Sequence, residues 1–308
     1  MKVAVIGGTG FVGSYIIDEL LQQGHQPVLL ARPGSESKVV QRERCMLVPG
    51  DVKDAQAVRN TVQGCDAVIY VIGIIREFRE QGINFDELHY RAAARTADLA
   101  QEVGVKRFIL MSANGVKAKG TPYQMTKYRA EEHLQSTSLD WTIFRPSVIY
   151  GDPRGKMEFC TQLRDQLINT PFPVPLFYEG LVPNAPGSFK LAPIHARDVA
   201  TAFVKSLTLP ESIHQTYGLC GPDALTWKAI LELIAKVCGK SKLALPVPAL
   251  GIQAMATLFD SFSFFPVTRG QITMLLEGNT CDSSEVFKRF GITPIRFNEA
   301  SLAYLKQV

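Results

Sequence analysis

A glycine-rich turn near the N-terminus constrains this chain more than any other feature. Lys2–Ile6 is a short apolar run typical of a strand buried on both faces, and Phe11–Gln22 carries apolar residues at helical spacing. Between the two runs, the sequence Gly7-Gly8-Thr9-Gly10-Phe11-Val12-Gly13 fits G-x-x-G-x-x-G. A glycine turn that joins a strand to a helix presents free backbone N–H groups and the positive end of the helix dipole to phosphates. This context predicts a dinucleotide-binding site.

The glycines of this turn have separate mechanical roles. Gly7 permits a tight exit from the strand, Gly10 lets the backbone approach a pyrophosphate, and Gly13 allows the helix to pack closely on the strand. We expect the turn to contact the cofactor through six residues, which are Gly7, Thr9, Gly10, Phe11, Val12 and Gly13.

The first half of the chain alternates strand-like with helix-like segments. Further strands are predicted at 27–31, 46–48, 67–71, 108–111 and 141–144, and helices at 85–103 and 123–136. Such alternation requires parallel pairing through right-handed crossovers, so we predict an α/β fold with a doubly wound parallel Rossmann sheet. Ligands of such a sheet bind beyond the carboxyl ends of its strands.

The second half of the chain is less regular. It contains turn-rich stretches after Tyr150, and helices are predicted at 196–207, 226–238 and 251–262. We interpret residues 1–150 as an NAD(P)-binding Rossmann domain. Residues 151–308 are interpreted as a smaller C-terminal α+β lobe that contacts a substrate or a partner and can exchange elements with the sheet.

Composition and charge exclude several classes of protein. The 308 residues carry 33 Lys and Arg against 29 Asp and Glu, and a net charge of +4 is too small for a nucleic-acid footprint. The six cysteines lie far apart and form no C-x-x-C pair, so we expect reduced, packed thiols and no metal site. The N-terminus leads directly into the first strand, which predicts a cytoplasmic protein without a signal or transit peptide.

One apolar segment, residues 243–267, leaves two interpretations open. Its only charge is Asp260, and prolines at 246, 248 and 266 interrupt it, so its uncharged stretch is short for a membrane span. The segment is either a core helix of the C-terminal lobe or an exposed surface for a membrane or a hydrophobic protein partner. The second interpretation would make the protein membrane-associated at its periphery.

The residues that follow the predicted strands indicate which dinucleotide binds. NAD-binding proteins commonly place a carboxylate after the second strand, where it accepts hydrogen bonds from the ribose 2′-hydroxyl. Arg32 follows that strand here, and a guanidinium fits a 2′-phosphate, so NADP(H) is favoured over NAD(H). The alternative is a solvated surface arginine. Asp51 and Val52 follow the third strand near the expected adenine, and Gly73 follows the fourth, where a missing side chain leaves room for the cofactor.

Tyr123 and Lys127 are the candidate catalytic pair. They stand four residues apart on a predicted helix, so they share one face. An ammonium beside a phenol favours the phenolate, so we expect a lowered pKa for Tyr123. The tyrosine would exchange a proton with a substrate hydroxyl or carbonyl while a hydride moves to or from nicotinamide, and Lys127 would also bind the nicotinamide ribose.

These motifs together resemble the short-chain dehydrogenase/reductase superfamily in its extended and atypical branches. The resemblance covers nearly the whole chain, and the matching subgroup contains proteins similar to the NADPH-binding accessory subunit of respiratory complex I. It is carried by the glycine turn, Asp51-Val52, Tyr123 and Lys127, the segment 145–151 (RPSVIYG) and the segment 193–200 (PIHARDVA). The resemblance implies that Pro146, Ser147 and Val148 bring backbone to the nicotinamide carboxamide.

The chain departs from that superfamily at two positions. Active extended members have a Ser or Thr after the fifth strand to orient the substrate carbonyl, and here Ala113 takes that place. Ser112 is the candidate substitute, with Asn114 as an alternative. The asparagine usual in the preceding long helix is replaced by His89.

Two hypotheses of different class follow from these observations. The first is an NADPH-dependent reductase or epimerase-like enzyme that acts on a small-molecule substrate through Tyr123, Lys127 and Ser112. The second is a non-catalytic NADPH-binding protein that assembles or stabilises a membrane complex of the respiratory or photosynthetic kind.

Overall fold

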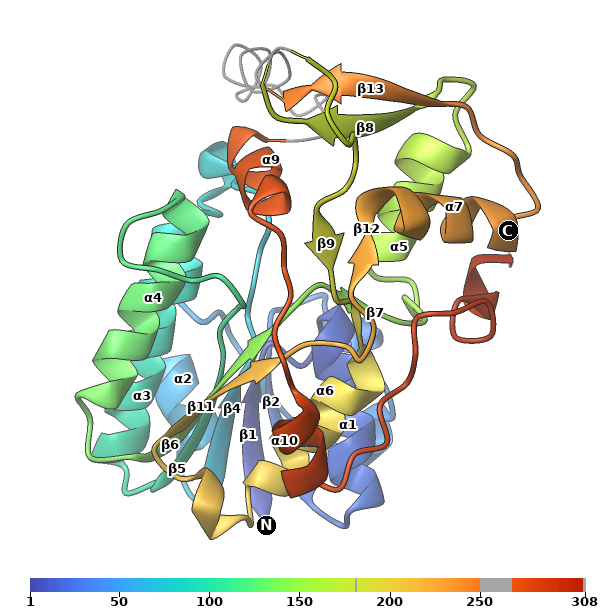
Figure 1. Cartoon of the computed structure of the whole chain (residues 1–308). Helices are drawn as coiled ribbons and strands as arrows, with labels where there is room; N and C mark the ends of the chain where they lie inside the picture. The colour runs from blue at the N-terminus through green and yellow to red at the C-terminus, as the bar shows by residue number, and fades with distance from the viewer. Residues whose placement is uncertain (181, 250–267, 307–308) are drawn as a thin grey trace. The chain divides into compact units, whose positions relative to one another are not determined.

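Figure 1 shows the computed structural model of the chain, which describes residues 1–180, 182–249 and 268–306. The chain divides into two compact units. Unit 1 consists of Met1–Pro146, Ala196–Leu219 and Ser283–Thr293, and unit 2 consists of Ser147–His195, Cys220–Asp282 and Pro294–Val308. The sequence predicts one boundary near residue 150 with an exchange of elements. In the structure, two later segments of the chain return to unit 1.

Unit 1 is built on a parallel sheet of seven strands in the order β11-β6-β5-β4-β1-β2-β3. The strands are β1 (Lys2–Ile6), β2 (Gln26–Ala31), β3 (Met46–Pro49), β4 (Ala67–Tyr70), β5 (Arg107–Met111), β6 (Asp140–Pro146) and β11 (Gln215–Leu219). Every neighbouring pair is parallel; Val3, for example, is level with Pro27 on one side and with Ala67 on the other. The predicted Rossmann-like α/β fold is therefore confirmed, and the sequence patterns did not predict β11.

Helices cover both faces of this sheet (Figure 1). On one face, α1 (Phe11–Gln22) packs against α6 (Ala196–Ser206). On the other face, α2 (Ala55–Val62), α3 (Ala92–Glu102) and α4 (Pro122–Gln135) share one apolar core with the strands. A π-helical turn, η4 (Asp86–Arg91), leads directly into α3, and α10 (Ser284–Arg289) contacts β11. Short 3-10 turns complete the unit at Glu36–Lys38, Arg42–Arg44, Arg79–Gln81 and Pro210–Ser212.

A buried arginine joins the later segment of unit 1 to the sheet. Arg107 is 6% exposed, and its guanidinium donates to the Ser206 carbonyl at 2.7 Å and to the Ser212 hydroxyl at 2.9 Å. It also donates to the Thr142 hydroxyl on β6 at 2.5 Å. A planar fork with several donors can satisfy such a set of buried oxygens, so Arg107 ties β5, β6 and the end of α6 together.

Unit 2 consists of short strand pairs and helices around one apolar core. β7 (Ile149–Tyr150) pairs with β10 (Ile194–His195), β8 (Val174–Tyr178) with β13 (Ala244–Pro248), and β9 (Lys190–Leu191) with β12 (Leu225–Thr226). The helices are α5 (Phe159–Leu163), a π turn at Arg164–Ile168, α7 (Trp227–Val237), α9 (Arg269–Leu276) and a 3-10 turn at Ala303–Lys306. Trp227 lies in the core and donates its indole N–H to the Pro175 carbonyl at 2.9 Å.

One prediction about the cysteines is wrong. Cys220 and Cys281 form a disulfide with their Cα atoms 5.6 Å apart, whereas the wide spacing of the cysteines in the sequence predicts reduced thiols throughout. The two residues are 61 positions apart, and the fold brings them together by placing Asn279 beside Leu191 and Ala192. Spacing along the chain carries no trace of such a long-range pairing. Cys45, Cys65, Cys160 and Cys238 are free thiols, as predicted.

The apolar segment 243–267 falls only partly within the described residues. Its first part contains β13, and both Leu243, directly before that strand, and Leu245 within it are exposed. The helix predicted at 251–262 lies outside the described residues. No helix within the described ranges has the length and hydropathy that crossing a bilayer requires.

Candidate functional site

The glycine turn between β1 and α1 has the geometry of a phosphate-binding loop. Gly7 has a φ of +104°, which favours glycine, and its carbonyl accepts from the Gly10 N–H at 3.0 Å. A Cβ on Gly13 would lie 2.3 Å from the Gly7 oxygen and 2.8 Å from the Gly8 Cα. The helix therefore begins directly against the turn, as the predicted role of Gly13 requires.

The N-terminus of α1 carries no compensating group within the described structure. Gly10 is its N-cap, so no side chain accepts from the first N–H groups, and the first turn contains no Asp or Glu. Phe11, Val12 and Gly13 form that first turn. Their free N–H groups and the positive end of the helix dipole would suit an anionic ligand. A pyrophosphate fits this end of the helix.

Three other predicted cofactor residues follow the carboxyl ends of β2 and β3. Arg32 is exposed directly after β2, and among the described residues its guanidinium has no hydrogen bond or ion pair. Asp51 follows β3, and one of its oxygens accepts from the Lys53 N–H at 3.0 Å. Val52 is buried, and its carbonyl accepts from Arg95 on α3 at 2.9 Å. Because the strands are parallel, these residues lie at the same edge of the sheet as the glycine turn.

Lys127 and Gly73 lie next to each other at this edge. The Lys127 ammonium donates to the Met111 carbonyl at the end of β5, at 2.9 Å, and a Cβ on Gly73 would lie 3.6 Å from Nζ. Lys127 is only 4% exposed, and burial lowers its pKa to about 8, although the nearby Glu131 opposes that shift. Within the described ranges Met111 is its one acceptor, which leaves two of the three ammonium N–H groups for a ligand.

Tyr123 lies one turn before Lys127 near the start of α4. That start is fixed by Thr121, whose hydroxyl accepts from the Gln124 N–H at 3.3 Å while the Gln124 side chain accepts from the Thr121 N–H at 2.8 Å. The Tyr123 ring packs edge-on against Phe85 and His89 at 5.7 and 5.0 Å between ring centroids. Burial raises the pKa of Tyr123 to about 12. The expected lowering by Lys127 is therefore not found.

The end of β5 contains a buried hydroxyl without a partner. Ser112 is 3% exposed, and its Oγ has no hydrogen bond within the described structure. Its N–H donates to the Phe144 carbonyl, and the Asn114 N–H donates to the Pro146 carbonyl, both at 2.8 Å. Ala113 between them is buried. Buried hydroxyls are nearly always hydrogen-bonded, so Ser112 presents an unused donor and acceptor.

Three predicted residues lie where β6 ends and unit 2 begins. Pro146 is the last residue of β6. Within unit 2, the buried Ser147 hydroxyl donates to the Ala192 carbonyl, and the Val148 carbonyl accepts from the Ile194 N–H at 2.9 Å. These bonds hold the segment after β6 against the strand that contains Ile194.

His89 stands out in the sequence only as a departure from the superfamily. In the structure His89 contacts Tyr123 and Thr126 of α4 and accepts from the Ile74 N–H, directly after Gly73. Its aromatic neighbour Phe85 stands one turn before it, and that spacing is the only trace of the cluster in the sequence.

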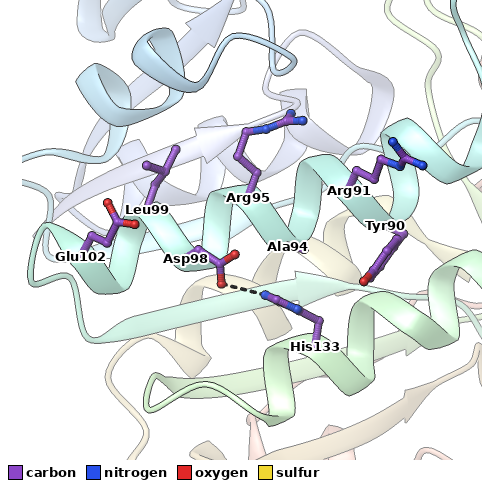
Figure 2. A pocket seen from close by; sticks show the side chains of 8 residues that line it. All are labelled: Tyr90, Arg91, Ala94, Arg95, Asp98, Leu99, Glu102 and His133. Atoms are coloured by element: carbon purple, nitrogen blue, oxygen red, sulfur yellow. Dashed lines mark hydrogen bonds and ion pairs between the residues drawn. The ribbon is translucent and has the colours of Figure 1, made fainter.

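A separate shallow hollow of about 470 Å³ lies on the surface of η4, α3 and α4 (Figure 2). It is lined by Tyr90, Arg91, Ala94, Arg95, Asp98, Leu99, Glu102 and His133. Figure 2 shows the Asp98 carboxylate facing His133, with 2.7 Å between the oxygen and Nε2. Asp98 pairs with His133 inside the hollow, whereas Arg91, Arg95 and Glu102 pair with residues outside it. No predicted site residue lines the hollow.

Proteins of known name resemble this chain in sequence, and several of their names mention a nicotinamide dinucleotide. Residues 7–170 match a family described as NAD(P)H-binding. The chain is 26% identical over 254 residues to NADH dehydrogenase (ubiquinone) 1 alpha subcomplex subunit 9 of Dictyostelium discoideum, which covers 80% of this chain and 67% of that protein. It is 23% identical over 309 residues to the NADH-ubiquinone oxidoreductase 40 kDa subunit of Neurospora crassa, covering 98% and 78%. With the NAD(P)H azoreductase of Xenophilus azovorans it shares 25% over 241 residues, covering 77% and 74%.

Solved structures share the fold along almost the whole chain. The crystal structure of gox2253 has a TM-score of 0.76 at 22% identity and covers 99% of this chain and 96% of its own. The UDP-glucose 4-epimerase of Thermus thermophilus, in complex with NAD, has a TM-score of 0.73 at 17% identity, with 99% and 98% covered. At these identities the likeness concerns the fold alone.

Proposed function

Because this chain belongs to the NAD(P)H-binding family, we propose that it is an NADP(H)-dependent oxidoreductase or epimerase-like enzyme that acts on a small molecule. The observation that carries this proposal is the proximity of Lys127 to Gly73 at the edge of the sheet that also bears the uncapped N-terminus of α1. The central pyrophosphate of a dinucleotide would fit the helix N-terminus, and its nicotinamide ribose would fit the lysine.

The preference for NADP(H) rests on Arg32. An exposed guanidinium without a partner in the described structure, directly after β2, suits a 2′-phosphate. One carboxylate oxygen of Asp51 accepts from the Lys53 N–H. The other oxygen would accept a hydrogen bond from the adenine amine.

In this proposal Tyr123 acts as the proton donor for carbonyl reduction. When bound, the reduced nicotinamide supplies a hydride to the carbonyl carbon. A pKa of about 12 keeps the Tyr123 phenol protonated at neutral pH, so it can give its proton to the carbonyl oxygen, and the product is an alcohol. Lys127 holds the nicotinamide ribose through the N–H groups that Met111 leaves free. The Ser112 hydroxyl, which has no partner among the described residues, donates to the substrate carbonyl.

The catalytic part of this proposal is tested with Tyr123→Phe. Turnover, measured as NADPH oxidation against a panel of quinones, ketones and aldehydes, should be lost. The Kd for NADPH should stay within about twofold, because the phenol oxygen takes no part in cofactor binding. Tyr90→Phe, in η4 and with its ring lining the surface hollow of Figure 2, is the matched control and should keep full activity. Unchanged turnover in Tyr123→Phe would refute the mechanism.

The cofactor preference is tested with Arg32→Ala. Loss of charge-assisted hydrogen bonds should raise the Kd for NADPH about tenfold, which corresponds to about 1.4 kcal/mol, and leave the Kd for NADH unchanged. Arg42→Ala is the control. It removes another exposed arginine, which follows Arg32 in the chain but does not directly follow β2, and it should alter the Kd of neither nucleotide. Full retention of the NADPH preference in Arg32→Ala would count against this residue.

A second candidate function is the non-catalytic one, in which NADPH binding supports the assembly of a membrane complex. Two of the similar proteins are subunits of NADH dehydrogenase or NADH-ubiquinone oxidoreductase. Unit 2 exposes Phe172, Leu243 and Leu245, with exposed fractions of 72, 69 and 46%, along and next to the β8–β13 pair. Such side chains would suit a hydrophobic partner protein, or peripheral contact with a membrane through 243–267. Cytoplasmic location remains a prediction.

A comparison of surface variants with Tyr123→Phe distinguishes the two candidate functions. Replacing Phe172 and Leu243 by Ser should leave NADPH oxidation unchanged if the protein is an enzyme of small molecules. If the protein is an assembly factor, these variants should fail to support the complex, while Tyr123→Phe supports it fully.

A further inference from the structure

His89 occupies an unusual backbone position beside the proposed site. It lies in the π-helical turn η4 (Asp86–Arg91), which widens the start of the long helix that continues as α3. Single π-helical turns inside longer helices are rare and frequently occur at functional sites. The side chain is 2% exposed, so its two ring nitrogens must find partners inside the protein.

Those partners define the protonation state of the ring. Nε2 accepts from the Ile74 N–H at 3.1 Å, so it carries no proton. Nδ1 lies 3.3 Å from the Thr126 hydroxyl oxygen, which in turn donates to the Pro122 carbonyl at 2.8 Å. The imidazole proton must therefore be on Nδ1 and be donated to Thr126. Burial, with a contribution from the charge of Lys127, holds the pKa of His89 well below its usual range, in agreement with a neutral ring.

The ring also forms part of the wall around Tyr123. It stacks on Phe85 at 5.2 Å, and its edge-on contact with Tyr123 has an interplanar angle of 86°. Edge-to-face pairs of this kind have a preferred geometry and stabilise one orientation of the partner ring. Tyr123 thus meets two aromatic rings, His89 within η4 and Phe85 directly before it.

We propose that His89 is a positioning residue that holds the Gly73–Ile74 backbone through Nε2 and the Tyr123 ring through its edge. One buried side chain then fixes both the loop that approaches the nicotinamide end of the cofactor and the phenol that exchanges the proton. The proposal rests on the function proposed above, because it assigns His89 to the site formed by Gly73, Tyr123 and Lys127.

The competing explanation is that His89 only fills space in the core. Two substitutions separate the explanations, because one keeps the hydrogen bond to Ile74 and the other keeps the aromatic contact with Tyr123. His89→Gln places an amide oxygen near the position of Nε2, so it keeps an acceptor for the Ile74 N–H and removes the ring. His89→Phe keeps the ring and the burial and removes the acceptor. His133→Gln, on the exposed face of α4, is the matched control.

Two measurements report on these two contacts, and neither requires a substrate. The first is the Kd for NADPH, measured through nicotinamide fluorescence. The second is the side-chain NMR signal of Tyr123, assigned by its loss in Tyr123→Phe. His89→Phe should raise the Kd about tenfold and leave the Tyr123 signal close to its position in the unchanged protein. His89→Gln should keep the Kd within about threefold and shift and broaden the Tyr123 signal. His133→Gln should change neither.

Contrary outcomes are equally distinct. A Kd that stays unchanged in His89→Phe, or a Kd that rises as much in His89→Gln as in His89→Phe, would overturn the proposal. Nitrogen NMR of the His89 ring in the unchanged protein adds a check that folding defects do not affect, because the proposal requires a proton on Nδ1 and none on Nε2. Failure of the proposed function looks different: the unchanged protein would then bind no NADPH, or Tyr123→Phe would turn over normally.

Discussion

Substitution of Gly13 by alanine tests the glycine turn at the point where its geometry is tightest. The new methyl carbon would meet the Gly7 oxygen at 2.3 Å and the Gly8 Cα at 2.8 Å, and both neighbours are backbone atoms that cannot rotate away. Alanine in place of glycine within a helix gains about 1 kcal/mol. Overpacking of this kind costs about 1–3 kcal/mol, and the contact with rigid backbone places Gly13 at the upper end. We therefore expect a net loss of about 2 kcal/mol.

Gly10→Ala is the matched control in the same turn. Gly10 has φ −80° and ψ 177°, which alanine adopts readily, and the nearest atom to a Cβ there is the Gly7 oxygen at 3.2 Å. The change at this N-cap should lower the free energy of unfolding by no more than about 1 kcal/mol. It should nevertheless raise the Kd for NADPH at least about tenfold, because the methyl group would lie where backbone meets the pyrophosphate.

Urea unfolding and NADPH titration of both variants provide the measurements. Gly13→Ala should lose stability and affinity together, whereas Gly10→Ala should lose affinity far more than stability. A Gly13→Ala protein as stable as the unchanged one would contradict the close contact of α1 with the turn. An unaltered NADPH affinity in Gly10→Ala would refute the assignment of this turn to the pyrophosphate.

Three further predictions concern stability. Arg107→Met should lower the free energy of unfolding by about 3 kcal/mol, because it leaves several buried oxygens without a donor; a loss below about 1 kcal/mol in urea unfolding would contradict this. Lys127 has a folded-state pKa of about 8 against an ordinary 10.5, so the unfolded chain binds more protons between these values and stability should rise with pH by up to about 3 kcal/mol. Lys127→Met should lack that rise, and parallel pH profiles of the two proteins would argue against it. Reduction of the Cys220–Cys281 bridge, which closes a loop of 61 residues, should cost about 4 kcal/mol, whereas Cys220→Ser should not respond to reductant; equal responses would show that the bridge does not form.

The strands of the sheet could be predicted because most of them are buried on both faces. Such strands must be continuous apolar runs, as Lys2–Ile6 is, and glycine or a polar turn ends them. β11 (Gln215–Leu219) escaped because it is an edge strand that begins with two exposed polar residues and contains Gly218. Its assignment depends on pairing with β6, which is a long-range contact.

The chemistry of the site was less predictable than its position. The spacing of Tyr123 and Lys127 placed both on one helix face, yet it could not show that the ammonium turns to the Met111 carbonyl or that aromatic rings bury the phenol. Burial by those neighbours raises the pKa of Tyr123, and the lysine on the same helix face does not lower it. His89 and the Cys220–Cys281 bridge likewise involve residues far apart in the chain.

The central claim is that the uncapped start of α1, Arg32 and Lys127 together bind NADP(H). Parallel equilibrium titrations of the purified chain with NADPH and with NADH, at one salt concentration, test it most directly. We predict one site per chain and a Kd for NADPH about tenfold below that for NADH. A chain that binds neither nucleotide, or that binds NADH as tightly as NADPH, would contradict the account.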